Sequence, residues 1–142
     1  MPEPIQVVVD TNVLIAATRS SSGASQALLQ ELGSERWRMN VSTALLFEYE
    51  EQLTQLVGDF GIERNEVDEL LNAIIKHSTQ RLVSFLLRPN LRDPDDEFIV
   101  DLAVCARARF LITFNKRDFA GVTAKYGIEI VTPGEFLSFL RI

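Results

Sequence analysis

The 142-residue sequence is poor in cysteine, in positive charge and in long apolar runs. Because Cys105 is the only cysteine, the chain can build neither a disulfide framework nor a thiolate zinc site. No apolar run approaches the roughly 20 residues that a bilayer-spanning helix needs. The N-terminus, MPEPIQVVVD, lacks the basic start, apolar stretch and cleavage site of a secretory signal. We therefore expect a cytoplasmic protein that does not associate with membranes.

The formal net charge is -6 and the sequence pI is about 4.8. This balance argues against a protein that holds nucleic acid through a broad basic face. Net charge is not local charge, however. If several acids gather in one pocket, bound divalent cations reverse the local field, and a few basic residues at the rim can still contact phosphates.

The sequence has no internal repeat, low-complexity stretch or Pro/Gly-rich linker, so we expect one domain over residues 1–142. Apolar runs rich in β-branched residues predict strands, and 3.6-residue periodicity predicts helices. The expected strands are 5–9, 38–41, 82–86, 110–113 and 128–131. The expected helices are 13–18, 25–33, 43–57, 63–78, 95–108 and 133–140. Strands that alternate with helices predict a parallel α/β sheet.

Two helix starts are marked by their sequence. Thr132-Pro133-Gly134-Glu135 has a hydroxyl residue, a proline and a glutamate at the spacing of a capping box. Asp93-Pro94-Asp95-Asp96 has the same arrangement with acids. In the structural interpretation of the second segment, Asp93 caps a helix while the next two acids offset its dipole.

Polar residues follow three of the predicted strands. In an open parallel sheet, ligands bind beyond the carboxyl ends of the strands. The segments at these ends are Asp10-Thr11-Asn12, Ser42-Thr43 and 114–118. Asp10 comes directly after a buried strand, where an ionised carboxylate needs a cation or several hydrogen-bond donors. Capping of the next helix explains Asp10 equally well.

Further acids lie on the expected helices 43–57 and 95–108. Periodicity places Glu48 and Glu50 on opposite flanks of one apolar stripe, with Glu51 facing away, and it does not choose between the flanks. On the other helix, spacing leaves Asp95 and Asp96 tied, and Asp101 is expected in solvent. Hard oxygen ligands without histidine or cysteine suit Mg²⁺ or Mn²⁺ rather than zinc.

Together, in this order, these segments resemble the PIN-domain family of metal-dependent nucleases, in particular the VapC-like toxins of bacterial and archaeal toxin-antitoxin pairs. The resemblance covers essentially the whole chain. VVVDTNVLIAA is similar to the family's first strand with its metal-binding aspartate, matched by Asp10. VSTALLFEYEEQL resembles the second strand and helix, where the family glutamate corresponds to Glu48. In RDPDDEFIVDLAVCARARFLITFNKRDF, the family acid corresponds to Asp96, which breaks the tie with Asp95.

The family's fourth acidic position is occupied here by Asn115, and Asp118 lies three residues further on. The resemblance implies a three-layer α/β/α fold around a mainly parallel sheet of about five strands. It also implies hydrolysis of RNA phosphodiester bonds with Mg²⁺ or Mn²⁺. The implied catalytic and metal-binding residues are Asp10, Glu48, Asp96 and Asp118, with Asn115 as a further metal ligand. The residues implied to orient them are Thr11, Asn12, Ser42 and Thr113, while Lys116 and Arg117 would contact RNA phosphates.

As partners we expect the RNA substrate, a small antitoxin protein and a second copy of the chain in a homodimer. An alternative is a PIN fold that binds RNA or protein with little catalysis, because Asn115 weakens the site. Phosphotransfer proteins in which Asp10 is phosphorylated fit less well. Haloacid-dehalogenase-like phosphatases require a second aspartate two residues later, where Asn12 stands. Response-regulator receivers require paired acids at the end of the first strand.

Overall fold

A five-stranded sheet forms the centre of the computed structural model, which describes residues 3–20, 22–58, 61–84, 90–91 and 93–141. The strand order is β3-β2-β1-β4-β5, and every neighbouring pair is parallel. The strands are β1 (Ile5–Val9), β2 (Trp37–Val41), β3 (Ser78–Gln80), β4 (Phe110–Ile112) and β5 (Glu129–Val131). The expected parallel sheet of five strands is confirmed.

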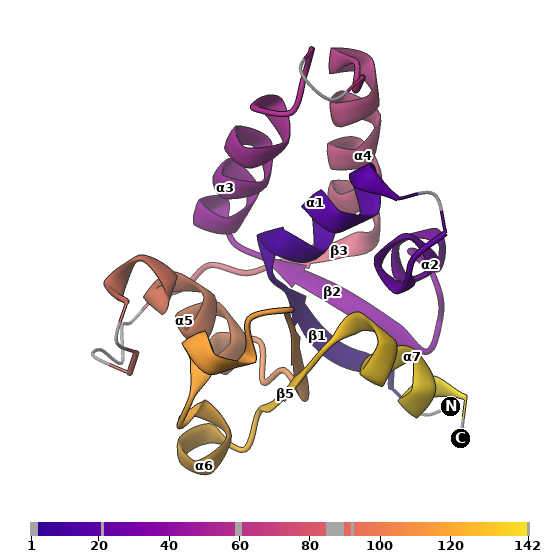
Figure 1. Ribbon diagram of the computed structural model, residues 1–142. Coiled ribbons are helices and arrows are strands. Elements are labelled where there is room, and N and C mark those ends of the chain that lie inside the picture. Colours follow the sequence, from indigo (N-terminus) through magenta and orange to yellow (C-terminus); the bar gives the residue numbers. More distant parts are fainter. Residues whose placement is uncertain (1–2, 21, 59–60, 85–89, 92, 142) are drawn as a thin grey trace.

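Helices cover both faces of this sheet (Figure 1). They are α1 (Thr11–Arg19), α2 (Ala24–Gln30), α3 (Thr43–Thr54), α4 (Arg64–His77), α5 (Glu97–Cys105), α6 (Val122–Tyr126) and α7 (Pro133–Leu140). Two 3₁₀ turns, η1 (Pro94–Asp96) and η2 (Lys116–Phe119), connect them. Helices α3 and α4 stand side by side as a pair beyond the sheet, whereas α5 and α6 lie across the sheet from α2 and α7 (Figure 1). The three-layer α/β/α architecture is therefore confirmed.

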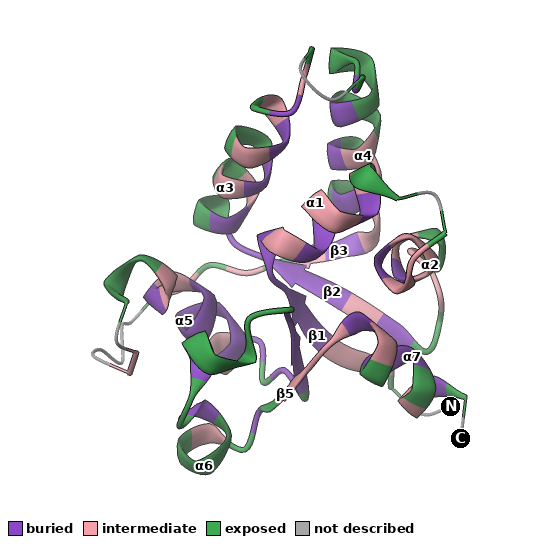
Figure 2. Cartoon of the chain, viewed as in Figure 1, coloured by how far each residue is buried: buried purple, intermediate pink, exposed green. Residues whose placement is uncertain are grey.

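Aromatic side chains pack together where α7 lies on the sheet. Burial covers the strands and the inward faces of the helices, whereas the far ends of α3 and α4 are exposed (Figure 2). Phe136 makes edge contacts with Trp37 and Phe110, at centroid distances of 5.7 and 5.4 Å. The capping box expected at Thr132 is present, with Glu135 N donating to Thr132 Oγ1 (3.2 Å) and Thr132 N donating to Glu135 Oε1 (2.8 Å). This box sets the start of α7.

The third strand differs from the sequence prediction. It occupies Ser78–Gln80 and begins directly after α4, whereas residues 82–84 form no strand and residues 85–86 lie outside the described residues. β3 is an edge strand that pairs only with β2 in the described sheet, so its short polar sequence needs no apolar alternation. Leu82, expected inside a buried strand, is 89% exposed. None of the described helices is both long enough and apolar enough to cross a bilayer.

Candidate metal centre

Asp10 lies at the carboxyl end of β1, near the middle of the sheet, and is buried. Its Oδ1 accepts a hydrogen bond from Thr11 N (2.8 Å), which makes Asp10 the N-cap of α1. Its Oδ2 accepts from Thr113 Oγ1 (2.8 Å) and from Asn12 Nδ2 (3.2 Å). Both sequence interpretations are therefore compatible, because one carboxylate caps the helix and still faces the strand end.

The ends of β1 and β4 are joined through Thr113 and Asn12. Thr113 Oγ1 accepts from Asn12 Nδ2 (3.3 Å) and from Asn115 N (3.0 Å), while Asn12 Oδ1 accepts from Phe114 N (3.2 Å). Thr113 is fully buried. These contacts hold the start of the loop after β4 against the start of α1, and they leave Asp10 little freedom to turn.

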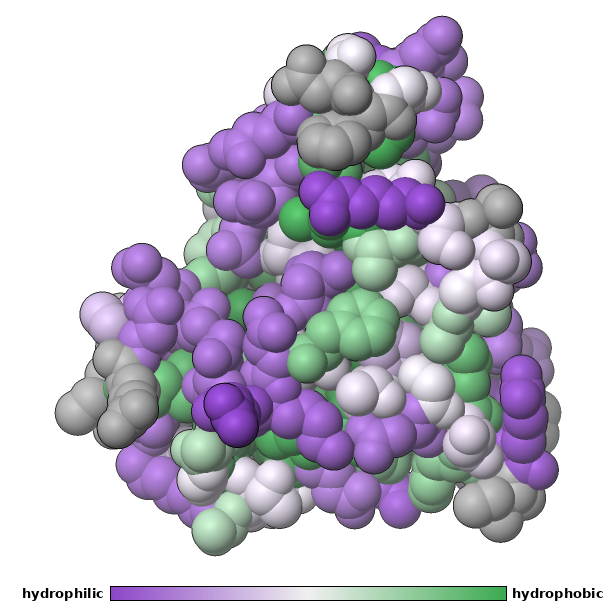
Figure 3. Space-filling view, in the orientation of Figure 1, coloured by the Kyte–Doolittle hydropathy of each residue, from purple (hydrophilic) through white to green (hydrophobic). Residues whose placement is uncertain are grey.

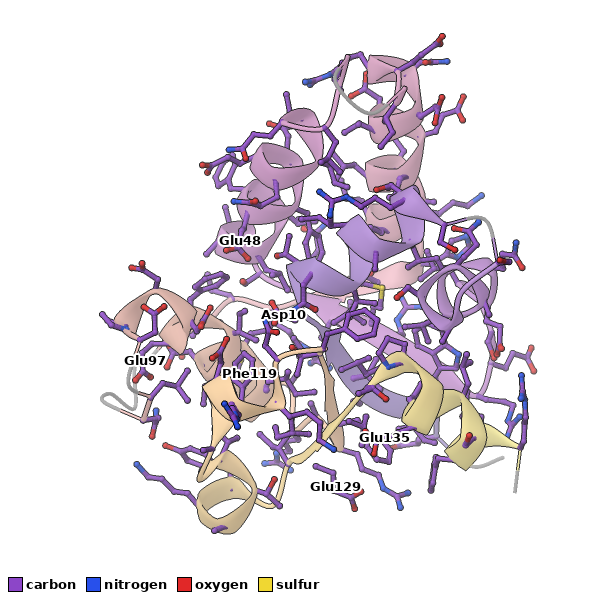
Figure 4. The ribbon with its side chains drawn as sticks, viewed as in Figure 1. Asp10, Glu48, Glu97, Phe119, Glu129 and Glu135 are labelled. Carbon is purple, nitrogen blue, oxygen red and sulfur yellow. The ribbon has the colours of Figure 1, made fainter. Side chains whose placement is uncertain are left out.

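Glu48 approaches Asp10 from α3. Thr11 Oγ1 donates a hydrogen bond to Glu48 Oε2, so one hydroxyl links the start of α1 to α3. The neighbouring Tyr49 is fully buried and donates from its hydroxyl to the carbonyl of Val9. Figure 4 shows Glu48 on the part of α3 nearest Asp10. The tie left by periodicity is broken in favour of the flank that carries Glu48, whereas Glu50 and Glu51 are exposed.

Ser42 serves α3 rather than the carboxylates. Its Oγ accepts a hydrogen bond from Leu45 N (3.2 Å), so Ser42 is the N-cap of this helix. No described hydrogen bond joins it to Asp10 or Glu48. The orienting role expected for Ser42 is thus limited to setting where α3 begins.

Asp96 joins η1 to α5 and is partly buried, whereas its neighbour Asp95 is exposed. Asp93 caps the turn as expected, since its Oδ1 accepts from Asp95 N (2.9 Å). Burial, together with the negative charges of Asp10, Asp93, Asp118 and Glu48, raises the pKa of Asp96 to about 6. Asp96 therefore shares an electrostatic environment with carboxylates from three other elements.

The pKa of Asp10 is also raised, first by burial and then by the charges of Glu48 and Asp118. The hydrogen bonds from Thr113 and Thr11 oppose this rise. Burial, Asp10 and Glu48 likewise raise the pKa of the Tyr49 hydroxyl well above its usual value. The fold thus holds Asp10 and Asp96 where burial and neighbouring negative charges disfavour their ionisation.

The loop after β4 carries the remaining expected residues. Residues 114–118 line an open hollow of about 570 Å³. Asn115, Arg117 and Asp118 are exposed, and Asp118 contributes to the field at Asp10 and Asp96. Lys116 Nζ lies 3.1 Å from Glu135 Oε1, so its charge is already partly matched. On the viewed face, the surface over α3 and α5 is largely hydrophilic (Figure 3).

Two acids of α5 were not anticipated. Glu97 is 2% exposed, and its Oε1 accepts from Asn90 N (2.5 Å) and Leu91 N (2.7 Å), which fixes the chain just before η1. The expectation that Asp101 lies in solvent is wrong, because it is only 5% exposed. Helix α5 is buried on more than one face, and the DPDDE sequence gave no sign of which acid the preceding loop would cover.

The donor types at this edge suit a hard cation, since all are oxygens. In the described part of the chain, no three acid, histidine or cysteine side chains are gathered closely enough to hold a metal ion. The carboxylates therefore influence one another electrostatically, but in this structure they do not form a complete set of metal ligands.

Comparison with known proteins identifies the family. A family model described as PIN domain matches residues 6–117, which is more than half of the chain. The chain belongs to the PIN domain family. The matched region includes Asp10, Glu48, Asp96 and Asn115, and it ends just before Asp118.

Among solved structures, a similar chain comes from VapBC2 of Rickettsia felis, a complex determined bound to a DNA fragment from its promoter. The identity is 14%, the TM-score is 0.56, and the match covers 89% of this PIN-domain chain and 97% of the other. At this identity the likeness concerns the fold, and in that respect the resemblance to VapC-like proteins is confirmed. No curated protein sequence matched the chain.

Proposed function

We propose that this PIN-domain protein is a divalent-metal-dependent endoribonuclease that acts as the toxin of a toxin-antitoxin pair. The observation that carries the proposal is the meeting of carboxylates from separate elements at the carboxyl end of β1. The charges of Glu48 and Asp118 contribute there to the raised pKa values of Asp10 and Asp96. Repulsion among these carboxylates lowers the stability of the folded chain when no cation is bound. A bound divalent cation would relieve this repulsion.

In this proposal Asp10, Glu48 and Asp96 bind Mg²⁺ or Mn²⁺, directly or through water, and Asp118 and Asn115 complete the site. A bound ion of this kind would supply an activated water and neutralise charge on the scissile phosphate. Hydrogen bonds orient two of these carboxylates, because Thr113 and Asn12 donate to Asp10 and Thr11 donates to Glu48. Arg117 and Lys116, at the rim, would contact the RNA backbone.

The biological role rests on the family and on the fold. The similar structure is that of VapBC2 bound to a DNA fragment from its promoter, and this likeness supports our proposal of a small antitoxin partner for this protein. An antitoxin must mask the metal site or its approach in order to silence a nuclease. We further propose that the chain forms a homodimer.

The test is cleavage of single-stranded RNA by the purified full-length protein. We expect cleavage with Mg²⁺ or Mn²⁺, none in excess chelator, and products that carry a 5′-phosphate and a 3′-hydroxyl. Glu48→Gln should remove the activity. Glu51→Gln is the matched control, because it lies on the same helix but is exposed. Undiminished cleavage in chelator would contradict the mechanism.

One observation favours a second function. Asn115 occupies the position at which the family more commonly has an acid. Among the described residues, no three acids lie close enough together to bind one ion. A binding module with weak catalysis would retain RNA without cutting it. Stable RNA binding in Mg²⁺ with no product, in a sample free of antitoxin, would favour this alternative.

A further inference from the structure

Asn40 is an unusual residue for the interior of a buried strand. It lies in β2 and is fully buried, although asparagine is depleted in strands. Its Nδ2 donates to Gln6 Oε1 (3.0 Å) and to the carbonyl of Val7 (3.1 Å), and its Oδ1 accepts from Arg81 Nε (2.9 Å). The buried amide is therefore satisfied, and it holds the guanidinium group of Arg81 in a defined orientation.

A second guanidinium is held on the same face of the sheet. Arg38, two residues before Asn40 on the same face of β2, donates from Nε to Thr79 Oγ1 (2.7 Å) and from Nη2 to the carbonyl of Ser78 (3.1 Å). Asn40 pairs with Thr79 in the parallel register, so Arg38, Asn40, Thr79 and Arg81 all lie on one face of the β2–β3 ladder. Both arginines are partly buried.

This arginine pair, Arg38 and Arg81, is held by neutral acceptors. Among the described residues neither guanidinium forms an ion pair with a carboxylate. A guanidinium has five N–H donors, and these contacts use two of Arg38 and one of Arg81. The remaining donors have no acceptor among the described residues.

The sequence around Arg81 is basic, whereas the chain as a whole is acidic. Four of the 14 lysines and arginines lie within residues 76–92, and none of the 20 acids does. Partly buried arginines are normally paired with acids, so two arginines without an ion pair to any described carboxylate point to an anion from outside the chain. An oriented guanidinium suits phosphate oxygens in particular, because its fork can donate two parallel hydrogen bonds.

We propose that the arginine pair is a phosphate-binding subsite for the RNA strand that enters the acidic site. The inference rests on the proposed nuclease function. Arg81 follows β3 at the carboxyl end, where its N–H donates to the carbonyl of Val41 (2.8 Å). β3 lies two strands from β1, about 10 Å away at ordinary strand spacing, so a strand cut at Asp10 reaches Arg81 within a few nucleotides. Contacts to phosphate give affinity without base preference, and they offset the repulsion between RNA and the acidic chain.

The test measures binding of a 20-nucleotide single-stranded oligouridylate in chelator, so that no cleavage is needed. The variant Arg38→Gln/Arg81→Gln should bind at least about tenfold more weakly than the unchanged protein. If two phosphate contacts are lost, the slope of log affinity against log salt should fall by about 1.4 in magnitude, at about 0.7 per contact for single strands. Arg64→Gln is the control, because Arg64 is exposed and pairs with Asp68 (3.3 Å) on α4. It should change neither quantity.

A second variant separates charge from folding effects. Arg38→Lys/Arg81→Lys keeps both charges and loses the planar fork, so it should retain the full salt slope and bind a few times more weakly. Thermal melts of all variants show whether loss of the contacts to Asn40 and Thr79 unfolds the sheet edge. If only the glutamine variant unfolds, the RNA affinity of the lysine variant is the test. An affinity equal to that of the unchanged protein would then overturn the subsite.

Three further outcomes are distinct. Equal affinity and equal salt slope in the folded glutamine variant would overturn the subsite, even if the protein cleaves RNA. Binding of a polyglutamate peptide that is lost in this variant, with RNA binding unchanged, would assign the pair to an acidic protein instead. RNA binding without metal-dependent cleavage would contradict the nuclease function and leave the phosphate contact standing.

Discussion

The two halves of the acidic site are built differently. Asp10 and Glu48 belong to a half in which donors hold the carboxylates, with Thr113, Asn12 and Thr11 as their partners. The half that carries Asp96 and Asp118 is formed by 3₁₀ turns, and at the start of α5 the Asp96 side chain makes no capping hydrogen bond.

The difference follows from where each half begins. In the first half, Asp10 sits directly on the buried end of β1 beside β4, and Glu48 on α3 is tied to it through Thr11, so core packing and strand pairing position the half before any ligand arrives. The second half lies on short turns beyond the sheet, where few neighbours fix a side chain. We infer that the first half is preorganised, and that Asp96 and Asp118 move onto a cation when it binds.

The largest expected effect comes from the preorganised half. Asp10→Asn should lower kcat/KM for RNA cleavage by at least about a hundredfold, because it removes charge from the centre of the shared site. The amide oxygen can still accept the hydrogen bond from Thr11 N, and relief of the repulsion from Glu48 and Asp118 offsets the acceptor lost to Thr113 and Asn12, so the melting temperature should change little. Steady-state kinetics beside thermal melts measure both. Activity within a few-fold of the unchanged protein would mean that Asp10 only caps α1.

The adjustable half offers a matched pair of neighbours. Asp96→Asn should also lower kcat/KM by at least about a hundredfold, whereas Asp95→Asn should have a small effect because Asp95 is exposed. The same kinetic assay applies. Full activity in Asp96→Asn together with loss in Asp95→Asn would show that the wrong member of the pair had been chosen.

Sequence pattern alone singled out Asp10 and left one tie in each half, Glu48 with Glu50 and Asp95 with Asp96. Asp10 could be found because an acid after an apolar strand is conspicuous, and the strand itself follows from its valines. The choice between Asp95 and Asp96 could not be made by spacing, because a 3₁₀ turn precedes α5 and breaks the helical period there. Only the family resemblance separated them.

Long-range contacts account for the remaining misses. β3 is three polar residues whose strand conformation comes from pairing with β2, and nothing in its own sequence announces it. Glu97 is buried because the chain at Asn90 and Leu91 folds over it, which helical periodicity does not describe. The arginine pair escaped notice for the same reason, since Arg38 and Arg81 meet only through strand pairing.

A moderate effect on stability is expected at Glu97, which holds the chain just before η1 in the adjustable half. Glu97→Gln weakens the hydrogen bonds from Asn90 N and Leu91 N to a buried carboxylate, at a cost of about 2 kcal/mol. This corresponds to a fall in melting temperature of about 4 to 8 °C. Glu129→Gln, at an exposed glutamate of β5, is the control and should melt normally. Equal melting temperatures would mean that Glu97 does not anchor the start of η1.

The raised pKa of Asp96 should make both the stability of the metal-free protein and its metal affinity depend on pH. Without metal, the folded chain holds a proton on Asp96 up to about pH 6, above its ordinary value of 3.8, so this group's contribution to stability is present at low pH and lost as pH rises through 4 to 6. A metal ion competes with that proton, so its affinity should rise about tenfold between pH 5 and pH 7. Calorimetric titrations at the two values measure the change. Asp96→Asn should flatten the profile, and an unchanged slope in that variant would place the titrating group elsewhere.

The smallest effect is expected at Asn115, where the rim of the site departs from the commoner family acid. Its amide can offer oxygen to a cation but adds no charge, so an ion near this position is held more weakly than by aspartate. Asn115→Asp should therefore tighten metal binding in the absence of RNA, with at most a modest effect on cleavage, because the scissile phosphate brings negative charge of its own. The same change should slightly lower stability without metal, since one more carboxylate joins Asp10, Asp96 and Asp118. Because Asn115 is exposed, both shifts should be small and should shrink as salt is added. Calorimetric metal titration and thermal melts in chelator measure the two halves of this expectation. If metal affinity and metal-free stability both equal those of the unchanged protein, residue 115 does not face the site, and the cation is held by the β1–α3 half with Asp96 alone.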